Sequence, residues 1–140
     1  MYERIKDDIL GKKYSLSIAF ISAKKSRELN KKYRKKNKAT NVLSFALHKN
    51  EGEILLSPSV IRKEAGMFNK TYKQFLEFLV IHGMLHLKGM THSSTMDKAQ
   101  NFYFAKYQGK YYEKYLYRHR HRVANDQNRS GRVRQRRKKS

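Results

Sequence analysis

Residues 72–92 read YKQFLEFLVIHGMLHLKGMTH, and this stretch decides the fold. Apolar side chains occupy nearly every side of a helix drawn through it, which is typical of a helix buried at the centre of a small protein. Thr71 stands directly before the stretch and is a favourable N-terminal cap. Gly89 provides a natural helix end. The sequence therefore predicts a central buried helix over about residues 72–88.

Three histidines occupy the C-terminal half of this stretch. His82 and His86 are four residues apart, so they fall on one helix face, one turn apart. A bend at Gly89 would let His92 return toward the same face. Three neutral imidazoles that converge on one point make a zinc site with one open ligand position, which is typical of a catalytic metal. The chain has no cysteine, so any zinc must be held by histidine or carboxylate.

The residue after His82 distinguishes this pattern from that of zinc peptidases. In the His-Glu-x-x-His signature a glutamate at that position acts as the general base, whereas this chain has Gly83. Zinc lowers the pKa of bound water to about 7, so hydrolysis does not require a neighbouring carboxylate. A peptidase is therefore disfavoured. The histidines outside this stretch, namely His48, His119 and His121, are expected to be solvated.

Hydrophobic periodicity and turn residues predict the remaining elements. A helix capped by Ser22 should turn Leu29 and Tyr33 inward, and a strand after Gly11 should bury one face. The expected strands are 14–21, 42–47 and 53–56, with a hairpin at 48–52; the expected helices are 2–10, 23–33, 58–68, 72–88 and 93–107, the last interrupted near Gly109.

The composition indicates a polyanionic partner. The formal net charge is +22 over 140 residues, and nucleic acid is the usual partner of so basic a chain. No segment is apolar for the roughly 18 residues that a membrane span requires, and Met1–Leu10 lacks the apolar run of a secretory signal. We therefore expect one domain, no membrane partner and a cytoplasmic location. Residues 118–140 contain ten Arg or Lys and one Asp, which predicts a disordered basic tail.

Three segments together resemble one known family. They are residues 82–92 (HGxLHLxGxxH), residues 29–45 (LNxxYRxKxKxTNVLSF) and residues 52–54 (GEI), with Ala65 in the helix that follows. Their order and spacing are similar to those of the YbeY family of bacterial rRNA maturation endoribonucleases. The resemblance implies an α+β fold: a small mixed β-sheet packed with helices, and a cleft that holds one Zn²⁺ ion.

The resemblance also implies an activity and the residues that perform it. It implies a zinc-dependent, single-strand-specific endoribonuclease domain over residues 1–117, followed by the Arg/Lys-rich tail over residues 118–140. Such an enzyme acts in 16S rRNA 3′-end maturation and ribosome quality control. Its partners would be an rRNA precursor and the small ribosomal subunit, with no DNA specificity expected. By resemblance, the metal ligands are His82, His86 and His92, and the functionally essential arginine is Arg34.

The chemistry of the basic residues agrees with these roles. The planar guanidinium of Arg34 could clamp a non-bridging phosphate oxygen and stabilise the additional negative charge of the transition state. The basic loop that begins at Lys31 would follow the RNA backbone, and the tail would add affinity without sequence choice. The RNA-binding candidates in the loop are Lys31, Lys32, Lys35, Lys36 and Lys38.

Three departures from the family pattern leave alternatives open. Thr91 stands where the family usually has Asp, which Asp97 could replace; Glu53 stands where Asp is common; and the tail has no counterpart. The chain could instead be a zinc hydrolase of a peptide or small molecule. It could also be a non-catalytic ribosome-assembly factor in which the metal stiffens the helix end. Sites with three histidines also accept Ni²⁺ or Co²⁺.

Overall fold

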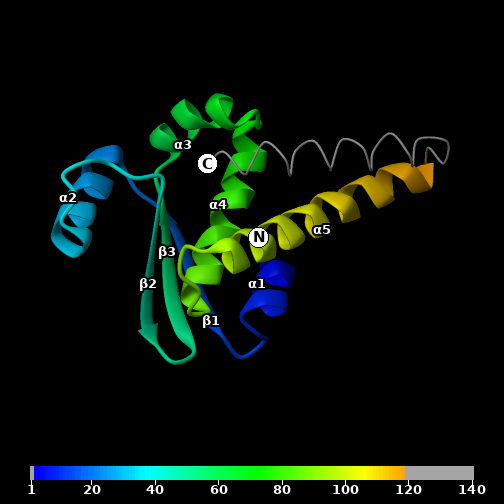
Figure 1. Ribbon diagram of the computed structural model, residues 1–140, viewed down its shortest axis with the longest axis horizontal. Coiled ribbons are helices and arrows are strands. Elements are labelled where there is room, and N and C mark those ends of the chain that lie inside the picture. Colours follow the sequence, from blue (N-terminus) through cyan, green and yellow to red (C-terminus); the bar gives the residue numbers. More distant parts are fainter. Residues whose placement is uncertain (1, 119–140) are drawn as a thin grey trace. The chain divides into compact units, whose positions relative to one another are not determined.

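The computed structural model describes residues 2–118, with side chains as far as Gln108 (Figure 1). The chain divides into two units, which meet in sequence between Thr91 and His92, and each is described by itself. The first unit contains α1 (Glu3–Ile9), β1 (Ser15–Phe20), α2 (Ala23–Arg34), β2 (Val42–His48), β3 (Glu51–Leu56), α3 (Pro58–Ala65), the 3₁₀ turn η1 (Gly66–Phe68) and α4 (Tyr72–Leu87); the second contains α5 (Ser94–Arg118).

A three-stranded mixed sheet forms the base of the first unit. The strand order is β1-β3-β2, with β1 parallel to β3 and β2 antiparallel to it. The predicted hairpin is confirmed, although β3 begins at Glu51, two residues earlier than expected, and a bulge interrupts the register between Ala46 and His48. The central strand carries the fully buried Ile54 and Leu56. The edge strand β1 is only half-buried along its inner face. His48 is exposed, as expected.

Helix α4 is the central buried element, as the sequence predicts. Nine of its sixteen residues are buried, and it packs against β2 and β3 as well as α1 and α3. Its start is fixed by a reciprocal capping box: the Gln74 amide donates to the Thr71 hydroxyl at 3.1 Å, and the Thr71 amide donates to the Gln74 side chain at 2.9 Å. The expected α+β class, with a small mixed sheet packed with helices, is confirmed.

Helix α2 corrects one expectation from the sequence. Tyr33 does not face inward but is 57% exposed, and Leu29 is only half-buried. The inner face carries Ser26 and Asn30, each 1% exposed. These side chains hydrogen-bond the backbone of the following loop, with Ser26 Oγ donating to the Thr40 carbonyl at 2.7 Å and accepting from the Thr40 amide at 2.9 Å. The polar side chains on the inner face of the helix supply the hydrogen-bond partners that the peptide groups of this loop need.

The last helix begins as predicted and ends later. Ser93 caps it by accepting a hydrogen bond from the Met96 amide at 3.2 Å. The expected interruption near Gly109 is wrong, because α5 continues to Arg118; a glycine inside a helix costs only about 1 kcal/mol. The described residues end at Arg118, so the rest of the expected tail over residues 118–140, with His119 and His121, lies outside them. None of the helices in the described part of the chain combines the length and apolar content needed to cross a lipid bilayer.

The Ser26 anchor gives a first prediction. Ser26→Ala removes the partner of both the amide and the carbonyl of Thr40, and leaving these groups unsatisfied should lower the free energy of unfolding by about 1–3 kcal/mol. Urea denaturation measures this change. Lys24→Ala, at an exposed position of the same helix, is the control and should change stability by less than about 0.5 kcal/mol. Equal stability of the two variants would show that the anchor contributes nothing.

Candidate metal centre

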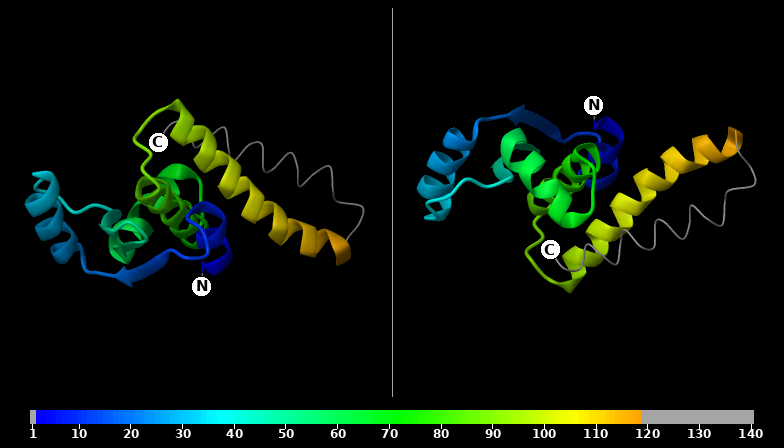
Figure 2. Two further views of the ribbon diagram at one scale, coloured as in Figure 1. Left: turned by 90° about the horizontal axis from the view of Figure 1, so that it is seen from below. Right: turned by 90° about the horizontal axis from the view of Figure 1, so that it is seen from above.

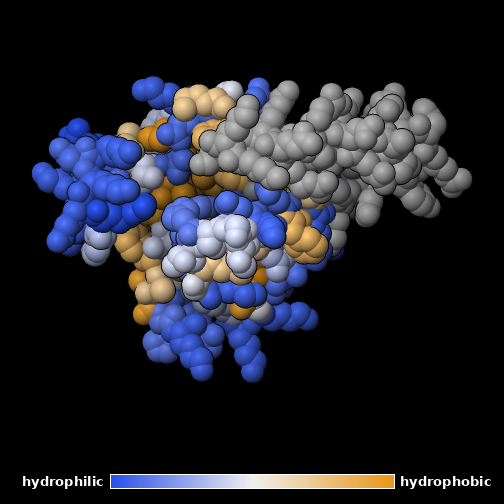
Figure 3. Space-filling model, viewed as in Figure 1, coloured by the Kyte–Doolittle hydropathy of each residue, from blue (hydrophilic) through white to orange (hydrophobic). Residues whose placement is uncertain are grey.

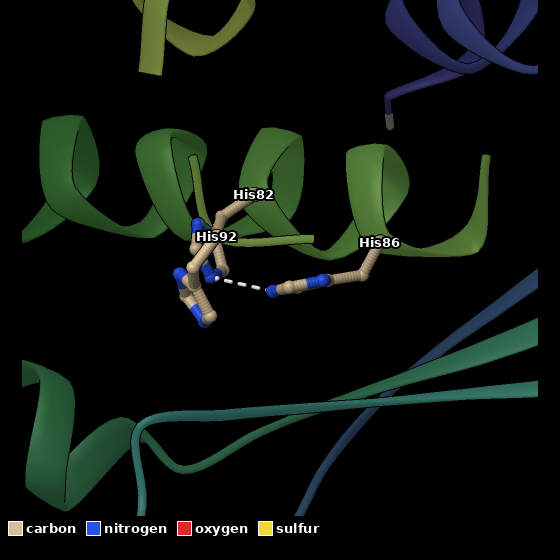
Figure 4. A group of neighbouring side chains, drawn as sticks. All are labelled: His82, His86 and His92. Atoms are coloured by element: carbon tan, nitrogen blue, oxygen red, sulfur yellow. Dashed lines mark hydrogen bonds between the residues drawn. The ribbon is translucent and has the colours of Figure 1, made fainter. Parts of the chain in front are cut away.

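The three predicted ligands come together in the structure. One ligand nitrogen each of His82, His86 and His92 can be chosen so that all three lie within 4.8 Å of one another (Figure 4). His82 and His86 project from the last turns of α4, and His92 follows the turn that ends the helix. The first two are half-buried and His92 is exposed. The sequence prediction that these side chains form one cluster is thus consistent with the geometry.

The spacing within the helical pair suits a shared cation. Nε2 of His82 and Nε2 of His86 are 3.0 Å apart, and the two rings are nearly perpendicular at 84°. Two nitrogens on one tetrahedral Zn²⁺, each about 2.0–2.1 Å from the metal, are separated by about 3.3 Å. The two nitrogens are thus only a few tenths of an ångström closer together than two ligands of one zinc ion would be. Within the described residues, no carboxylate belongs to the cluster.

The turn after α4 is a Schellman motif, which sets the position of the third histidine. The Gly89 amide donates to the His86 carbonyl at 2.9 Å, and the Met90 amide donates to the Leu85 carbonyl at 3.0 Å. Gly89 has φ +105°, a conformation that side chains with a Cβ rarely adopt. The chain therefore reverses within two residues of the helix end, and only Thr91 separates the motif from His92.

The same turn orients a ligand ring. Nδ1 of His86 lies 3.0 Å from the carbonyl oxygen of Met90. Because a carbonyl can only accept, Nδ1 carries the proton and donates, which leaves the Nε2 lone pair of a neutral ring available for a metal. Metal-binding histidines commonly make such a backbone contact. No sequence signal could have identified the Met90 carbonyl, because any residue at that position supplies the same oxygen.

Gly83 has a packing role that the sequence did not reveal. A Cβ built on it would lie 3.0 Å from both Ile54 Cδ1 and Ser44 Oγ. At Gly83, directly after His82, helix α4 therefore lies close to side chains of β2 and β3. A glutamate at this buried position would crowd the Ile54 and Ser44 side chains and bury a carboxylate, which is a further reason against a peptidase of the His-Glu-x-x-His type.

The candidate RNA-contacting residues form a second group. Arg34 ends α2, Lys35 caps it in the left-handed conformation with φ 58°, and the basic loop follows. These cations are all exposed: Lys31, Lys32, Arg34, Lys35, Lys36 and Lys38. Figure 2 shows α2 apart from α4, in agreement with Figure 1; α2 instead contacts α3. The structure thus gathers the cations around one helix end but does not bring Arg34 into the histidine cluster.

The glycine in the turn gives a second prediction. Gly89→Ala forces an L-residue into the left-handed region, which should destabilise the fold by about 1–2 kcal/mol and weaken zinc binding by displacing His92. Gly66→Ala is the matched control, since Gly66 has φ −62° and open space where a Cβ would lie; it should stabilise by about 0.4–1 kcal/mol. Thermal denaturation and zinc-competition titrations measure both. The same sign of stability change in both variants would contradict this account of the turn.

Comparisons with known proteins place the chain in a family. The model of the family "Endoribonuclease YbeY" matches residues 2–115. The chain is 38% identical over 92 residues to endoribonuclease YbeY of Thermodesulfovibrio yellowstonii, which covers 61% of this chain and 58% of that protein. It is 32% identical over 112 residues to the Staphylococcus carnosus protein of the same name, covering 71% and 70%.

A solved structure agrees with these sequence matches. The solution structure of TM1509 from Thermotoga maritima superimposes with a TM-score of 0.57 at 29% identity, covering 81% of this chain and 85% of that one. The expected recognition, which rested on residues 29–45, 52–54 and 82–92, is therefore confirmed. The chain belongs to the endoribonuclease YbeY family.

Proposed function

We propose that this protein is a zinc-dependent endoribonuclease that cleaves single-stranded RNA and acts in 16S rRNA 3′-end maturation and in ribosome quality control. The observation that carries the proposal is the cluster of three imidazole nitrogens within 4.8 Å, in a chain that belongs to the endoribonuclease YbeY family. The partners would be an rRNA precursor and the small ribosomal subunit in the cytoplasm. The matched relatives are endoribonucleases of this family, which supports the activity.

The donor set suits zinc in a catalytic role. Three histidines without cysteine or carboxylate form a neutral ligand set that leaves one coordination position open. When bound, Zn²⁺ supplies a Lewis acid that activates water and polarises a phosphoryl oxygen. His82, His86 and His92 would hold the ion, and the Met90 carbonyl would keep the His86 ring oriented. The exposure of His92 leaves the site open to a polymer substrate.

Arg34 and the loop lysines would bind the substrate. The guanidinium fork of Arg34 suits a non-bridging phosphate oxygen, and its permanent charge would stabilise the transition state. Lys31, Lys32, Lys35, Lys36 and Lys38 would neutralise neighbouring phosphates. For Arg34 to act at the cleaved bond, its guanidinium must come within hydrogen-bond distance of the phosphate that is held at the histidines when RNA binds.

Metal removal gives the first functional test. We expect purified protein to contain about one zinc per chain, and a chelator should abolish cleavage of a single-stranded RNA. His86→Ala should lose both the metal and the cleavage. His48→Ala is the control, since His48 is exposed at the end of β2 and lies outside the cluster. Elemental analysis and a gel-based cleavage assay measure both properties. Full cleavage by zinc-free protein would refute the proposal.

A second test separates the role of Arg34 from that of the metal. Arg34→Ala should bind zinc normally, yet its kcat should fall by about 10²–10³-fold, as expected when one donor to the developing charge is removed. Arg34→Lys should recover little of this loss because an ammonium cannot form the planar fork. Arg27→Ala, at an exposed position of the same helix, controls for lost charge. If Arg34→Ala cleaves at the full rate with zinc bound, the assignment of its role is wrong.

A further inference from the structure

An aromatic pair lies on the surface beside the basic loop. The ring of Tyr33, in the last turn of α2, meets the ring of Phe45, on β2, edge to face, with centroids 5.2 Å apart and an interplanar angle of 67°. Tyr33 is 57% exposed and Phe45 is half-buried. Tyrosine is intermediate in burial; what distinguishes Tyr33 is that it is more than half exposed while its ring packs against a second aromatic ring beside a run of cations.

The surrounding structure fixes this ring in place. Asn30 is buried beneath the end of α2, and its amide donates to the Lys38 carbonyl at 2.9 Å. The Lys36 amide donates back to the Asn30 carbonyl at 3.3 Å. These bonds tie the loop under the helix end, so the inner face is occupied and Tyr33 is left on the outer side. Phe45 is held by its strand, and the pair therefore forms a preorganised surface.

The charge around the pair identifies the kind of ligand. Residues 23–38 contain nine Lys or Arg and one Glu, and Figure 3 shows α2 as an almost continuous hydrophilic surface at the left of the view. The Lys32 ammonium lies 5.1 Å from the centre of the Tyr33 ring. A protein partner would need a larger apolar area than one ring among cations offers. An aromatic face beside phosphate-binding cations is instead the arrangement that single-stranded nucleic acid prefers.

The position of the pair on the sheet distinguishes it from the metal site. Ser44 faces α4, where its hydroxyl lies against Gly83. Since successive side chains of a strand point to opposite faces, Phe45 and Tyr33 lie on the other face of β2. This strand is at the edge of the sheet. A strand of RNA that reaches both sites must therefore pass around that edge.

We propose that Tyr33, supported by Phe45, is a stacking platform for one unpaired base of the RNA, separate from the point of cleavage. This inference rests on the proposed endoribonuclease function and adds a reason for its single-strand specificity. Bases in a duplex are already stacked on one another and cannot reach such a ring, whereas bases of a single strand can be splayed out. Lys32 would neutralise a phosphate next to the stacked base.

The absence of tryptophan from the chain permits a direct test. Tyr33→Trp introduces a single indole whose fluorescence should be quenched when an adenine stacks on it. The metal-loaded full-length variant is mixed in a stopped-flow instrument with single-stranded oligoadenylate of about ten nucleotides, a length that spans a typical binding site. The fluorescence is recorded at times too short for cleavage products to be detected on a gel. An abasic ribose-phosphate strand of the same length should bind without quenching.

Two controls separate stacking from general binding. Phe20→Trp, at a ring 54% exposed on β1, should not be quenched by either strand. Tyr33→Leu should bind oligoadenylate about tenfold more weakly and the abasic strand with unchanged affinity, and Tyr33→Phe should restore the affinity. The slope of log affinity against log salt should be unchanged in Tyr33→Leu, whereas Lys31→Ala should reduce its magnitude by about 0.7.

The possible failures are distinguishable. Quenching in both tryptophan variants, or an equal loss of affinity for both strands in Tyr33→Leu, overturns the platform. The platform is also overturned if Tyr33→Leu binds oligoadenylate with unchanged affinity. If the wild-type protein still cleaves RNA in that case, the endoribonuclease proposal stands. If the wild-type protein neither binds nor cleaves single-stranded RNA, both proposals fail.

Discussion

The close packing of α4 on the sheet at Gly83 is the constraint on which the rest of the site depends. Without a side chain at this residue, the helix backbone lies directly against Ser44 and Ile54. The histidines on either side of Gly83 are thereby held at the border of the core, half-buried rather than fully exposed. Burial of α4 also supplies the hydrophobic free energy that keeps this close approach in place.

The histidine cluster depends on backbone geometry at the end of α4. A helix alone can present only the His82–His86 pair, and the third ligand needs a reversal of the chain. The Schellman motif at Gly89 provides that reversal and presents the Met90 carbonyl to His86. The Lys88 ammonium also donates to the Ile9 carbonyl at 3.1 Å, which ties the end of α4 to α1. The end of α4 is therefore anchored on both sides of the turn.

Helix α2 differs from α4 in the side chains of its inner face. Its inner face carries Ser26 and Asn30, which hydrogen-bond the following loop. This arrangement leaves the cationic and aromatic side chains to the solvent. The apolar residue Tyr33 was expected to face the core because periodicity assumes an apolar inner face, and that assumption fails for a helix that anchors a loop.

The sequence alone determined most of the helices and strands and identified three histidines as candidate metal ligands. Local features can be predicted directly from the sequence. They include the apolar stretch at 72–88, the cap at Thr71, the glycine at 89 and the spacing of His82 and His86. Only the tertiary structure decided that His92 lies near the pair, that Gly83 lies against Ser44 and Ile54, and that Tyr33 is exposed beside Phe45. These outcomes depend on contacts between residues far apart in the chain or on backbone atoms that every residue has. Neither kind of contact produces a recognisable pattern in the amino-acid sequence.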